Sequence, residues 1–191
     1  MLRQGLKKRV GQHAMVVWYD AVTVEGKLQW QNTLGPLNAP FFRDCDALFV
    51  NYTWGRGTPG EVLSYLAEQM PGRRPSEVFL GVDVYGRGTY GGGGDSTHTA
   101  VAHAMSHGLS SAVFGPGWVY ESTGDTRSSW QQRNDQFWER IARVLPHGPR
   151  PVAARLPLST FFSQARVPIG DRIPDAGQPC LWGDGWIFRA R

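Results

Sequence analysis

The stretch Ala47-Leu48-Phe49-Val50-Asn51-Tyr52-Thr53-Trp54 decides how this chain can fold. It joins a short apolar run to a tail of polar and aromatic residues, which is typical of a buried strand that ends at a binding surface. Three other segments repeat this pattern, with apolar runs at Met15–Trp18, Val78–Val82 and Ser111–Phe114. Their tails are Tyr19-Asp20, Asp83-Val84-Tyr85 and the residues from Gly115 to Glu121.

The spacing of these runs indicates a repeated strand–helix unit. Their starts lie 31, 31 and 33 residues apart, counted from Val16, Ala47, Val78 and Ser111. A (β/α)8 barrel uses about 250 residues for eight units, or about 31 for each, and carries its chemistry at the carboxyl ends of its strands. The sequence therefore predicts an α/β fold that is a partial (β/α)8 TIM barrel, about half of one, with the binding face present on that half.

Amphipathic segments between the runs supply the expected crossover helices. The signals are an apolar face in the first ten residues, capping boxes with possible helix starts, and a glycine suited to a left-handed end. The apolar face is formed by Leu2, Leu6 and Val10. The capping boxes are Thr58-Pro59-Gly60-Glu61 and the start of the segment from Ser129 to Leu145. The glycine is Gly108, which follows the segment from Thr97 to His107. Because strand and helix patterns alternate, the strands should be parallel.

The end of the chain differs from the rest in composition. It is rich in Pro, Arg and Gly, and only Leu156–Phe162 has a strand-like pattern. The sequence therefore predicts a half-barrel domain over residues 1–162 and an irregular C-terminal tail or linker over residues 163–191.

The overall composition excludes several classes of protein. Of 191 residues, 41% are hydrophobic and 19% are charged, and the net charge is only +4 with scattered arginines, so a solvated surface is favoured over nucleic-acid binding. No apolar stretch approaches the roughly 20 residues of a membrane-spanning helix, and the basic first ten residues lack the apolar region of a secretory signal. Two cysteines, Cys45 and Cys180, do not make a disulfide framework, so we expect free thiols.

Two motifs resemble cofactor or metal sites without meeting their requirements. Gly86–Gly91 matches G-x-G-x-x-G, but no acidic residue follows at the distance that a dinucleotide site needs, and the next helix is expected only near Ser96. His103 and His107 stand four residues apart, but the glutamate of a zinc-protease helix is replaced by Ala104. We therefore expect a glycine-rich loop, two surface histidines, and no cofactor or metal.

The aromatic content points to carbohydrate. The chain has 8 Trp, 6 Tyr and 9 Phe, and many of them follow strands instead of lying within them. Trp and Tyr offer flat faces to sugar rings, while Asn and Asp bond directionally to hydroxyl or amide groups. The alternative is that these aromatics only pack between strand ends and loops. If the four strands align, a glycan-binding cleft would be lined by Tyr19, Asn51, Trp54, Asp83, Trp118 and Tyr120.

The strand-end segments resemble those of one known family. The carriers of the resemblance are Trp18–Asn32, Leu48–Trp54, Gly81–Gly88 and Phe114–Glu121. They are similar to strands five to eight of the catalytic barrel of the endo-β-N-acetylglucosaminidases of glycoside hydrolase family 85, including its cytosolic members. The resemblance covers about residues 2–158 and implies a cytosolic location.

The resemblance also implies a reaction. The family cleaves the bond between the two N-acetylglucosamines in the chitobiose core of N-glycans, with the substrate's own acetamido oxygen as nucleophile, which departs from the two-carboxylate scheme. An Asn-x-Glu element on the fourth strand supplies the orienting asparagine and the general acid. By this likeness Tyr19 is a supporting catalytic residue near the acetamido group, Trp30 and Trp54 are walls of the sugar site, and Tyr120 lines it.

This chain contains no Asn-x-Glu, so the expected activity differs from the family's. We expect the element to precede Met1, and we expect the chain alone to be nearly inactive; Glu121 is the only strand-end acid that could stand in. The open alternatives are a fragment of the endoglycosidase, a non-catalytic module that binds N-glycans, and a non-functional gene product. The expected partner is an N-glycan or glycoprotein, with no nucleic acid and no membrane.

Half a barrel should also leave two sheet edges unpaired. Closing a barrel removes every edge, whereas an open sheet of four strands keeps two. The expected edges are Met15–Trp18 and Ser111–Phe114, and they predict self-association of the chain.

Overall fold

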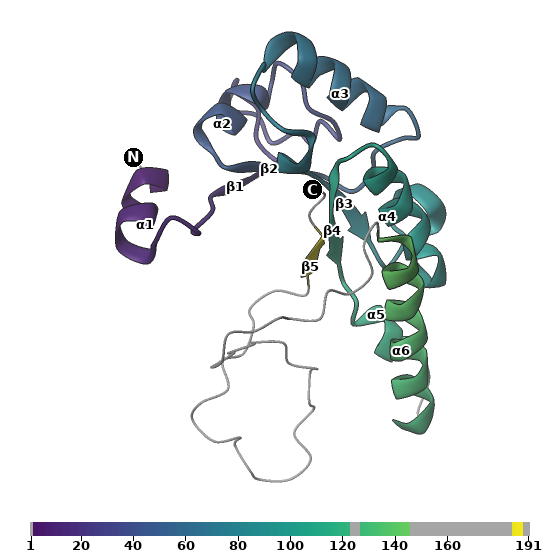
Figure 1. Ribbon diagram of the computed structural model, residues 1–191. Helices are drawn as coiled ribbons and strands as arrows, with labels where there is room; N and C mark the ends of the chain where they lie inside the picture. The colour runs from purple at the N-terminus through teal and green to yellow at the C-terminus, as the bar shows by residue number, and fades with distance from the viewer. Residues whose placement is uncertain (1, 123–126, 146–184, 189–191) are drawn as a thin grey trace.

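The computed structural model describes residues 2–122, 127–145 and 185–188, and all statements about structure refer to these residues (Figure 1). They form one sheet with helices packed against it. The sheet has the order β1-β2-β3-β4-β5. Its strands are β1 Val17–Tyr19, β2 Ala47–Val50, β3 Val78–Asp83, β4 Ser110–Phe114 and β5 Gly185–Phe188.

The first four strands are parallel and adjacent in chain order. β1 pairs with β2, β2 with β3 and β3 with β4, each in parallel register. This confirms the four strands and the parallel sheet predicted from the spacing of the apolar runs. Because all four strands run the same way, their carboxyl ends lie at the same end of the sheet, where the polar and aromatic tails begin.

The predicted helices are present, with small differences at their ends. The α-helices are α1 Leu2–Val10, α2 Ala39–Asp44, α3 Thr58–Gln69, α4 Thr97–Ser106, α5 Trp118–Glu121 and α6 Arg127–Val144. Two of these, the short helices α2 and α5, were not predicted. Short 3₁₀ turns are η1 Pro75–Glu77, η2 Tyr90–Gly92 and η3 Gly94–Ser96. Gly108 follows α4 with φ +72°, which confirms the predicted left-handed end.

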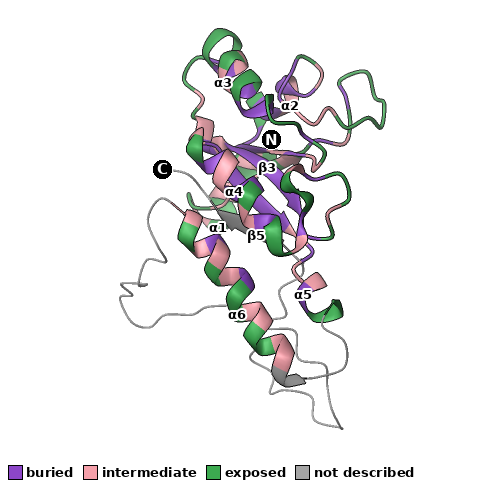
Figure 2. Cartoon of the chain, turned by 90° about the vertical axis from the view of Figure 1, so that its right-hand side faces the viewer, coloured by how far each residue is buried: buried purple, intermediate pink, exposed green. Residues whose placement is uncertain are grey.

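The main core lies between one face of the sheet and helices α2, α3, α4 and α6. We call this side of the sheet its helix-covered face. Figure 2 shows buried residues along the strands and on the inward sides of these helices, while α6 turns an exposed side outward. The strands contribute Leu48, Val50, Val78, Leu80, Val82 and Val113, and the helices contribute Phe42, Val62, Val101, Ala104, Phe137 and Ile141.

The opposite side, which we call the second face, carries a smaller cluster. Because strand residues alternate between faces, the neighbours of the core residues point here. Ala47, Phe79 and Ala112 are buried on this side with Phe49 packed against them. At its β1 end Val17 and Tyr19 are each 37% exposed. The second face therefore offers apolar surface that the described helices do not cover.

Four expectations are corrected. Ser111–Phe114 is no free edge, because β5 pairs with β4 in antiparallel register; this also makes residues 185–188 of the expected irregular tail a strand. Thr58 is no capping side chain: the helix begins there, and its hydroxyl instead accepts the amide N–H of Gly55. Helix α6 begins at Arg127, two residues before the predicted Ser129.

Other expectations lie outside the described residues or are only partly covered by them. The strand-like pattern Leu156–Phe162, the thiol of Cys180 and the rest of the tail lie outside. Cys45 is a buried free thiol, as predicted. In the described part of the chain, no helix combines the length and the apolar character needed to cross a membrane.

Candidate functional site

A hydrogen-bond network links the segments that follow β1 and β2. The Tyr19 hydroxyl donates to Asn51 Oδ1 at 2.8 Å, and Asn51 Nδ2 donates to Asn32 Oδ1 at 2.7 Å. The Thr53 hydroxyl donates to the same Asn32 oxygen at 2.6 Å. These four side chains are the centre of what we call the strand-end surface. They bring together two predicted site residues, Tyr19 and Asn51, from segments 32 residues apart in the chain.

A buried carboxylate behind the network holds the Asn32 turn in place. Asp20 follows β1 directly and is fully buried. Its Oδ2 accepts the backbone N–H groups of Gln31 at 3.0 Å and Asn32 at 2.8 Å, while its Oδ1 accepts Asn38 Nδ2 at 3.0 Å. Three donors satisfy the carboxylate, so its burial is tolerated. Asp20 thus fixes the loop that carries Trp30 and Asn32 against the end of β1.

Trp30 exposes an aromatic surface beside Tyr19. The tryptophan is 49% exposed. Burial is the largest influence on the pKa of the Tyr19 phenol and raises it. A side-chain hydrogen bond with Trp30 lowers this pKa, and the charge of Asp20 raises it further, so that the net shift is upward. The hydroxyl of Tyr19 is therefore protonated at neutral pH and acts as a hydrogen-bond donor. An exposed indole face beside a fixed hydroxyl suits a sugar ring, which has an apolar face and a polar rim.

A row of aromatic rings supports the strand-end surface from the second face. Tyr19 contacts Phe49 edge-on, Phe49 contacts Tyr52 edge-on, and Tyr52 contacts Phe114, with ring centroids 5.2, 5.8 and 5.4 Å apart. Burial raises the pKa of Tyr52 to about 12, with smaller contributions in the same direction from Tyr19 and Asp83. The row spans β1, β2 and β4 and fixes the position of the Tyr19 ring.

Asp83 and Arg87 form an ion pair at the end of β3. The Asp83 side chain is only 3% exposed and pairs with Arg87 Nε at 2.7 Å, whereas the Arg87 side chain is 67% exposed. Arg87 Nη2 also donates to Asp83 Oδ1 at 3.2 Å. The hydrogen bond to Asp83, followed by its charge, raises the pKa of Arg87. Asp83 therefore acts through Arg87, which is the group of the pair that faces solvent.

The loop after β3, residues 84–96, which we call the β3 loop, lies against the segment that follows β2. A Cβ built on Gly88 would meet Thr53 Cγ2 at 2.8 Å, so only glycine allows this approach at its φ of +76°. The contact places the ion pair next to the Tyr19–Asn51–Asn32–Thr53 network. The strand-end surface is therefore continuous from β1 to β3.

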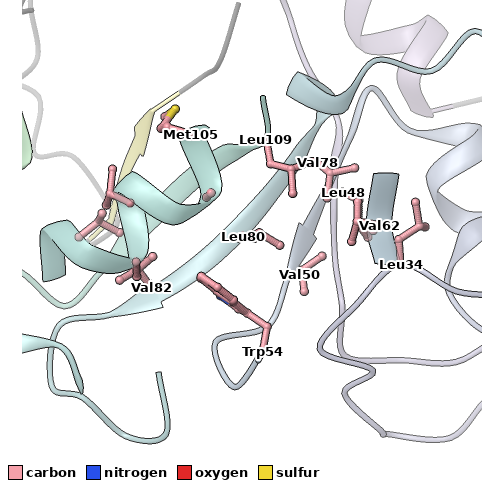
Figure 3. Close-up of a cluster of buried hydrophobic side chains, with 14 of the residues drawn as sticks. Leu34, Leu48, Val50, Trp54, Val62, Val78, Leu80, Val82, Met105 and Leu109 are labelled. Carbon is pink, nitrogen blue, oxygen red and sulfur yellow. The ribbon is translucent and has the colours of Figure 1, made fainter. Parts of the chain in front are cut away.

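Trp54 lies elsewhere, in the core. It is 3% exposed, and its indole N–H donates to the carbonyl of Gly81 at 2.7 Å. Figure 3 shows it in the same cluster as Val50 and Leu80. Its ring stacks on Tyr90 with centroids 5.1 Å apart. A residue enclosed in this way presents no face to a ligand, so Trp54 is a packing residue in this structure and not a wall of the strand-end surface.

Trp118 and Tyr120 lie on α5, after β4. Trp118 packs against the main core and against Gly94 of the β3 loop, and Arg133 of α6 lies over its ring at 5.6 Å. Tyr120 is 52% exposed and contacts Trp130 edge-on. Both residues lie at the same end of the sheet as the network, but Tyr120 contacts α6, and Trp118 lies against α6, Gly94 and the main core.

The sequence motifs set aside as cofactor sites have structural contacts. His103 stacks on Tyr90 with centroids 4.8 Å apart, and its Nε2 hydrogen-bonds to the carbonyl oxygen of Arg56 at 2.9 Å. The glycine-rich loop packs on itself, because a Cβ on Gly93 would meet Asp83 O at 2.7 Å. The glycines here serve close backbone packing.

Four residues of this surface were not predicted from the sequence. Asp20 stood in the tail of a predicted strand, so a charged residue at that position was an available signal. Arg87 lies five residues after Val82, in the glycine-rich motif, and gave no such signal. Asn32 and Thr53 gave no such signal, because a hydrogen bond over 21 residues depends on the path of the chain. The residues missed by the prediction are Asp20, Asn32, Thr53 and Arg87.

The sequence also matches a known protein family. The sequence model of glycosyl hydrolase family 85 matches residues 1–167. This chain belongs to glycosyl hydrolase family 85. The resemblance carried by the four strand-end motifs is thereby confirmed.

Curated relatives of the family 85 chain carry consistent names. It is 46% identical over 141 residues to cytosolic endo-beta-N-acetylglucosaminidase 2 of Arabidopsis thaliana, which is 70% of this chain and 19% of that protein. It is 40% identical to cytosolic endo-beta-N-acetylglucosaminidase of Gallus gallus over 149 residues, 78% of this chain and 19% of that protein. The human cytosolic endo-beta-N-acetylglucosaminidase is 40% identical over 132 residues, covering 69% and 17%. The chain thus spans about one fifth of the length of these relatives.

Proposed function

We propose that this chain forms strands five to eight of a family 85 TIM barrel and carries part of the glycan site of an endo-β-N-acetylglucosaminidase. The observation that carries the proposal is the strand-end surface, where a fixed Tyr19–Asn51–Asn32–Thr53 network lies beside the exposed indole of Trp30. In a barrel the carboxyl ends of the strands carry the chemistry. The substrate is the chitobiose core of an N-glycan on a glycoprotein.

The residues of the surface match what a sugar requires. Trp30 supplies a stacking face, and Tyr19, Asn51 and Thr53 supply donors and acceptors for hydroxyl and acetamido groups. Tyr19 is the supporting catalytic residue: its phenol remains protonated, and its single O–H, which donates to Asn51 Oδ1 here, would turn to the acetamido oxygen that attacks the anomeric carbon. Arg87 and its partner Asp83 extend the polar surface toward the rest of the glycan.

By the family resemblance, the glutamate of an Asn-x-Glu element would transfer the proton to the leaving oxygen. No Asn-x-Glu occurs in the sequence. Loss of general acid catalysis costs about 10²–10⁴-fold in rate, and loss of the group that stabilises the developing charge adds a similar factor. We therefore propose that the chain alone binds the chitobiose core in a cytosolic setting and turns it over slowly or not at all.

The second candidate is a non-catalytic N-glycan-binding module. It is favoured by the same combination, a polar surface with an exposed indole in a chain without Asn-x-Glu. The two candidates share the ligand and differ in whether these residues work with a general acid supplied elsewhere. We propose residues 1–162 as the unit that binds and residues 163–191 as a tail or linker whose strand β5 joins the sheet beside β4.

The test is binding and turnover of N,N′-diacetylchitobiose and of a chitobiose-core glycopeptide. We expect calorimetry to detect binding, and Trp30→Ala to weaken it about tenfold or more, because a stacking aromatic face is lost. The control is Val10→Ala on α1, which removes another exposed apolar side chain, in a helix attached at the amino end of β2. Mass spectrometry should detect no cleavage by the chain alone. Absence of binding by the unaltered chain would overturn the proposal. Efficient cleavage would overturn the statement that the chain alone lacks a general acid.

A further inference from the structure

Asn32 has a backbone conformation that side chains rarely adopt. Its φ is 55°, and among the described residues it is the one non-glycine residue with positive φ. Asn tolerates the left-handed region better than most residues, but the conformation still costs stability. Such strain persists only where surrounding contacts impose it, and it concentrates at functional sites.

The contact that imposes the conformation is the buried carboxylate of Asp20. It accepts the backbone N–H of Asn32 at 2.8 Å and that of Gln31 at 3.0 Å. A backbone held by two bonds to a fully buried group has little freedom. The direction of the Asn32 side chain is therefore fixed by the fold.

The Asn32 amide uses its oxygen within the protein and leaves its nitrogen free. Oδ1 accepts from Thr53 Oγ1 at 2.6 Å and from Asn51 Nδ2 at 2.7 Å. Nδ2 has no acceptor among the described residues, and it does not belong to the buried unpaired atoms there. Two N–H donors are thus available to a ligand beside Tyr19 and Trp30.

We propose that Asn32 is a further substrate-binding residue, which donates its amide N–H groups to a hydroxyl or carbonyl oxygen of the bound sugar. This inference rests on the proposed function and names one donor of its site. The backbone conformation alone would be served as well by glycine, which adopts φ 55° without strain. The two accepted bonds would be served as well by aspartate, whose oxygens can accept them from Thr53 and Asn51.

The experiment compares Asn32→Asp and Asn32→Gly with the unaltered chain, using N,N′-diacetylchitobiose as probe in calorimetry. Asn32→Asp keeps both accepted bonds and removes only the free donors, so we expect an unchanged melting temperature and about tenfold weaker binding. Asn32→Gly should be at least as stable against unfolding as Asn32→Asp and should also bind weakly. The control for added charge is Asn134→Asp on α6, which keeps the acceptor for Trp138 Nε1; it should bind as the unaltered chain does.

The outcomes separate this inference from the proposed function. If the unaltered chain binds the disaccharide and both Asn32 variants bind equally well, Asn32 is a structural turn residue and the inference is overturned, while the proposed function stands. If the unaltered chain does not bind, both are overturned. If Asn32→Asp is itself unstable, Asn32→Gly decides: normal binding by it rejects the role, and weak binding with a normal melting temperature supports it.

Discussion

Asp20 illustrates how one buried residue shapes the surface at the end of β1. Its carboxylate is fully buried, accepts three hydrogen bonds and places the loop of Trp30 and Asn32. A buried charge with every partner in place is tolerated, whereas donors left without an acceptor are costly. The geometry of the exposed network therefore depends on a group that a ligand never touches.

Replacing Asp20 by Ala should lower the free energy of unfolding of the chain. The backbone N–H groups of Gln31 and Asn32 would lose their acceptor, and Asn38 Nδ2 would keep only the carbonyl of Thr33. Each unsatisfied buried donor costs about 1–3 kcal/mol. Because water can reach part of this loop, we expect a loss of about 3 kcal/mol in the free energy of unfolding, measured by urea denaturation. Asp135→Ala, at an exposed position on α6, should change it by no more than about 0.5 kcal/mol. Equal stability of the two variants would show that Asp20 does not hold the loop.

Helix α1 is attached to the rest of the molecule without burying any of its residues. Two ion pairs connect it to the segment before β2, from Arg3 and Lys7 to Asp46 Oδ1 at 2.8 and 2.6 Å. Burial by itself would raise the pKa of Asp46, but hydrogen bonds from Lys7, the Val16 amide and Arg3 together lower it to about 2.

The attachment of α1 should be lost in acid. A carboxylate whose pKa is lower in the folded state contributes stability above its ordinary pKa of 3.8, and this contribution disappears as the pH falls toward 2. We expect hydrogen exchange of the α1 amides to accelerate between about pH 4 and pH 2, relative to α3. Asp46→Asn should accelerate exchange in α1 already at neutral pH and abolish this pH dependence. A pH dependence that survives in Asp46→Asn would assign it to other groups.

At the scale of the elements, the sequence was a good guide to the four parallel strands. It was a poorer guide to where helices begin and to which segment pairs with β4. The four parallel strands followed from short apolar runs at a regular spacing, because local pattern and burial agree there. The capping box at Thr58 failed, since backbone geometry placed the helix start at Thr58 itself. The partner of β4 could not be predicted, because the antiparallel pairing of residues 185–188 joins segments more than 70 residues apart.

The whole molecule has apolar surface that its own helices do not cover. Val17 and Tyr19 on the second face are each 37% exposed, and β1 has no strand on its outer side among the described residues. Free edges beside apolar surface favour pairing with another chain. The predicted self-association therefore concerns the β1 edge, because β5 occupies the edge beside β4.

Self-association should depend on protein concentration and on β1. We expect sedimentation velocity to show a rising mean mass at tens of micromolar, roughly the range in which weak interfaces form. Val17→Lys should reduce it, because a charge on an edge strand opposes pairing. Leu28→Lys, at a residue 70% exposed in the loop after β1, is the control and should have no effect. A monomer at every concentration, or an equal effect of both variants, would reject this edge as the interface.

The sequence by itself determined the order of strands and helices, their parallel arrangement and the family. These depend on residues close together in the chain, where apolar runs, helix signals and strand-end motifs can be read directly. It also named Tyr19, Asn51 and Asp83, because the carboxyl ends of parallel strands lie at the same end of the sheet, whereas Trp30 was named by the family resemblance alone.

Only the tertiary structure decided which of these side chains face solvent. Tyr19 is the last residue of β1 and Trp54 lies four residues after the end of β2, yet Trp54 turns into the core and Tyr19 joins an exposed network. The difference arises because the carbonyl of Gly81, on the neighbouring strand, accepts the indole N–H, while Asn51 accepts the phenol. Asn32 joined the site in the same way, through a buried Asp20 that the local sequence does not connect to it. Contacts between distant segments set these directions, and no local pattern encodes them.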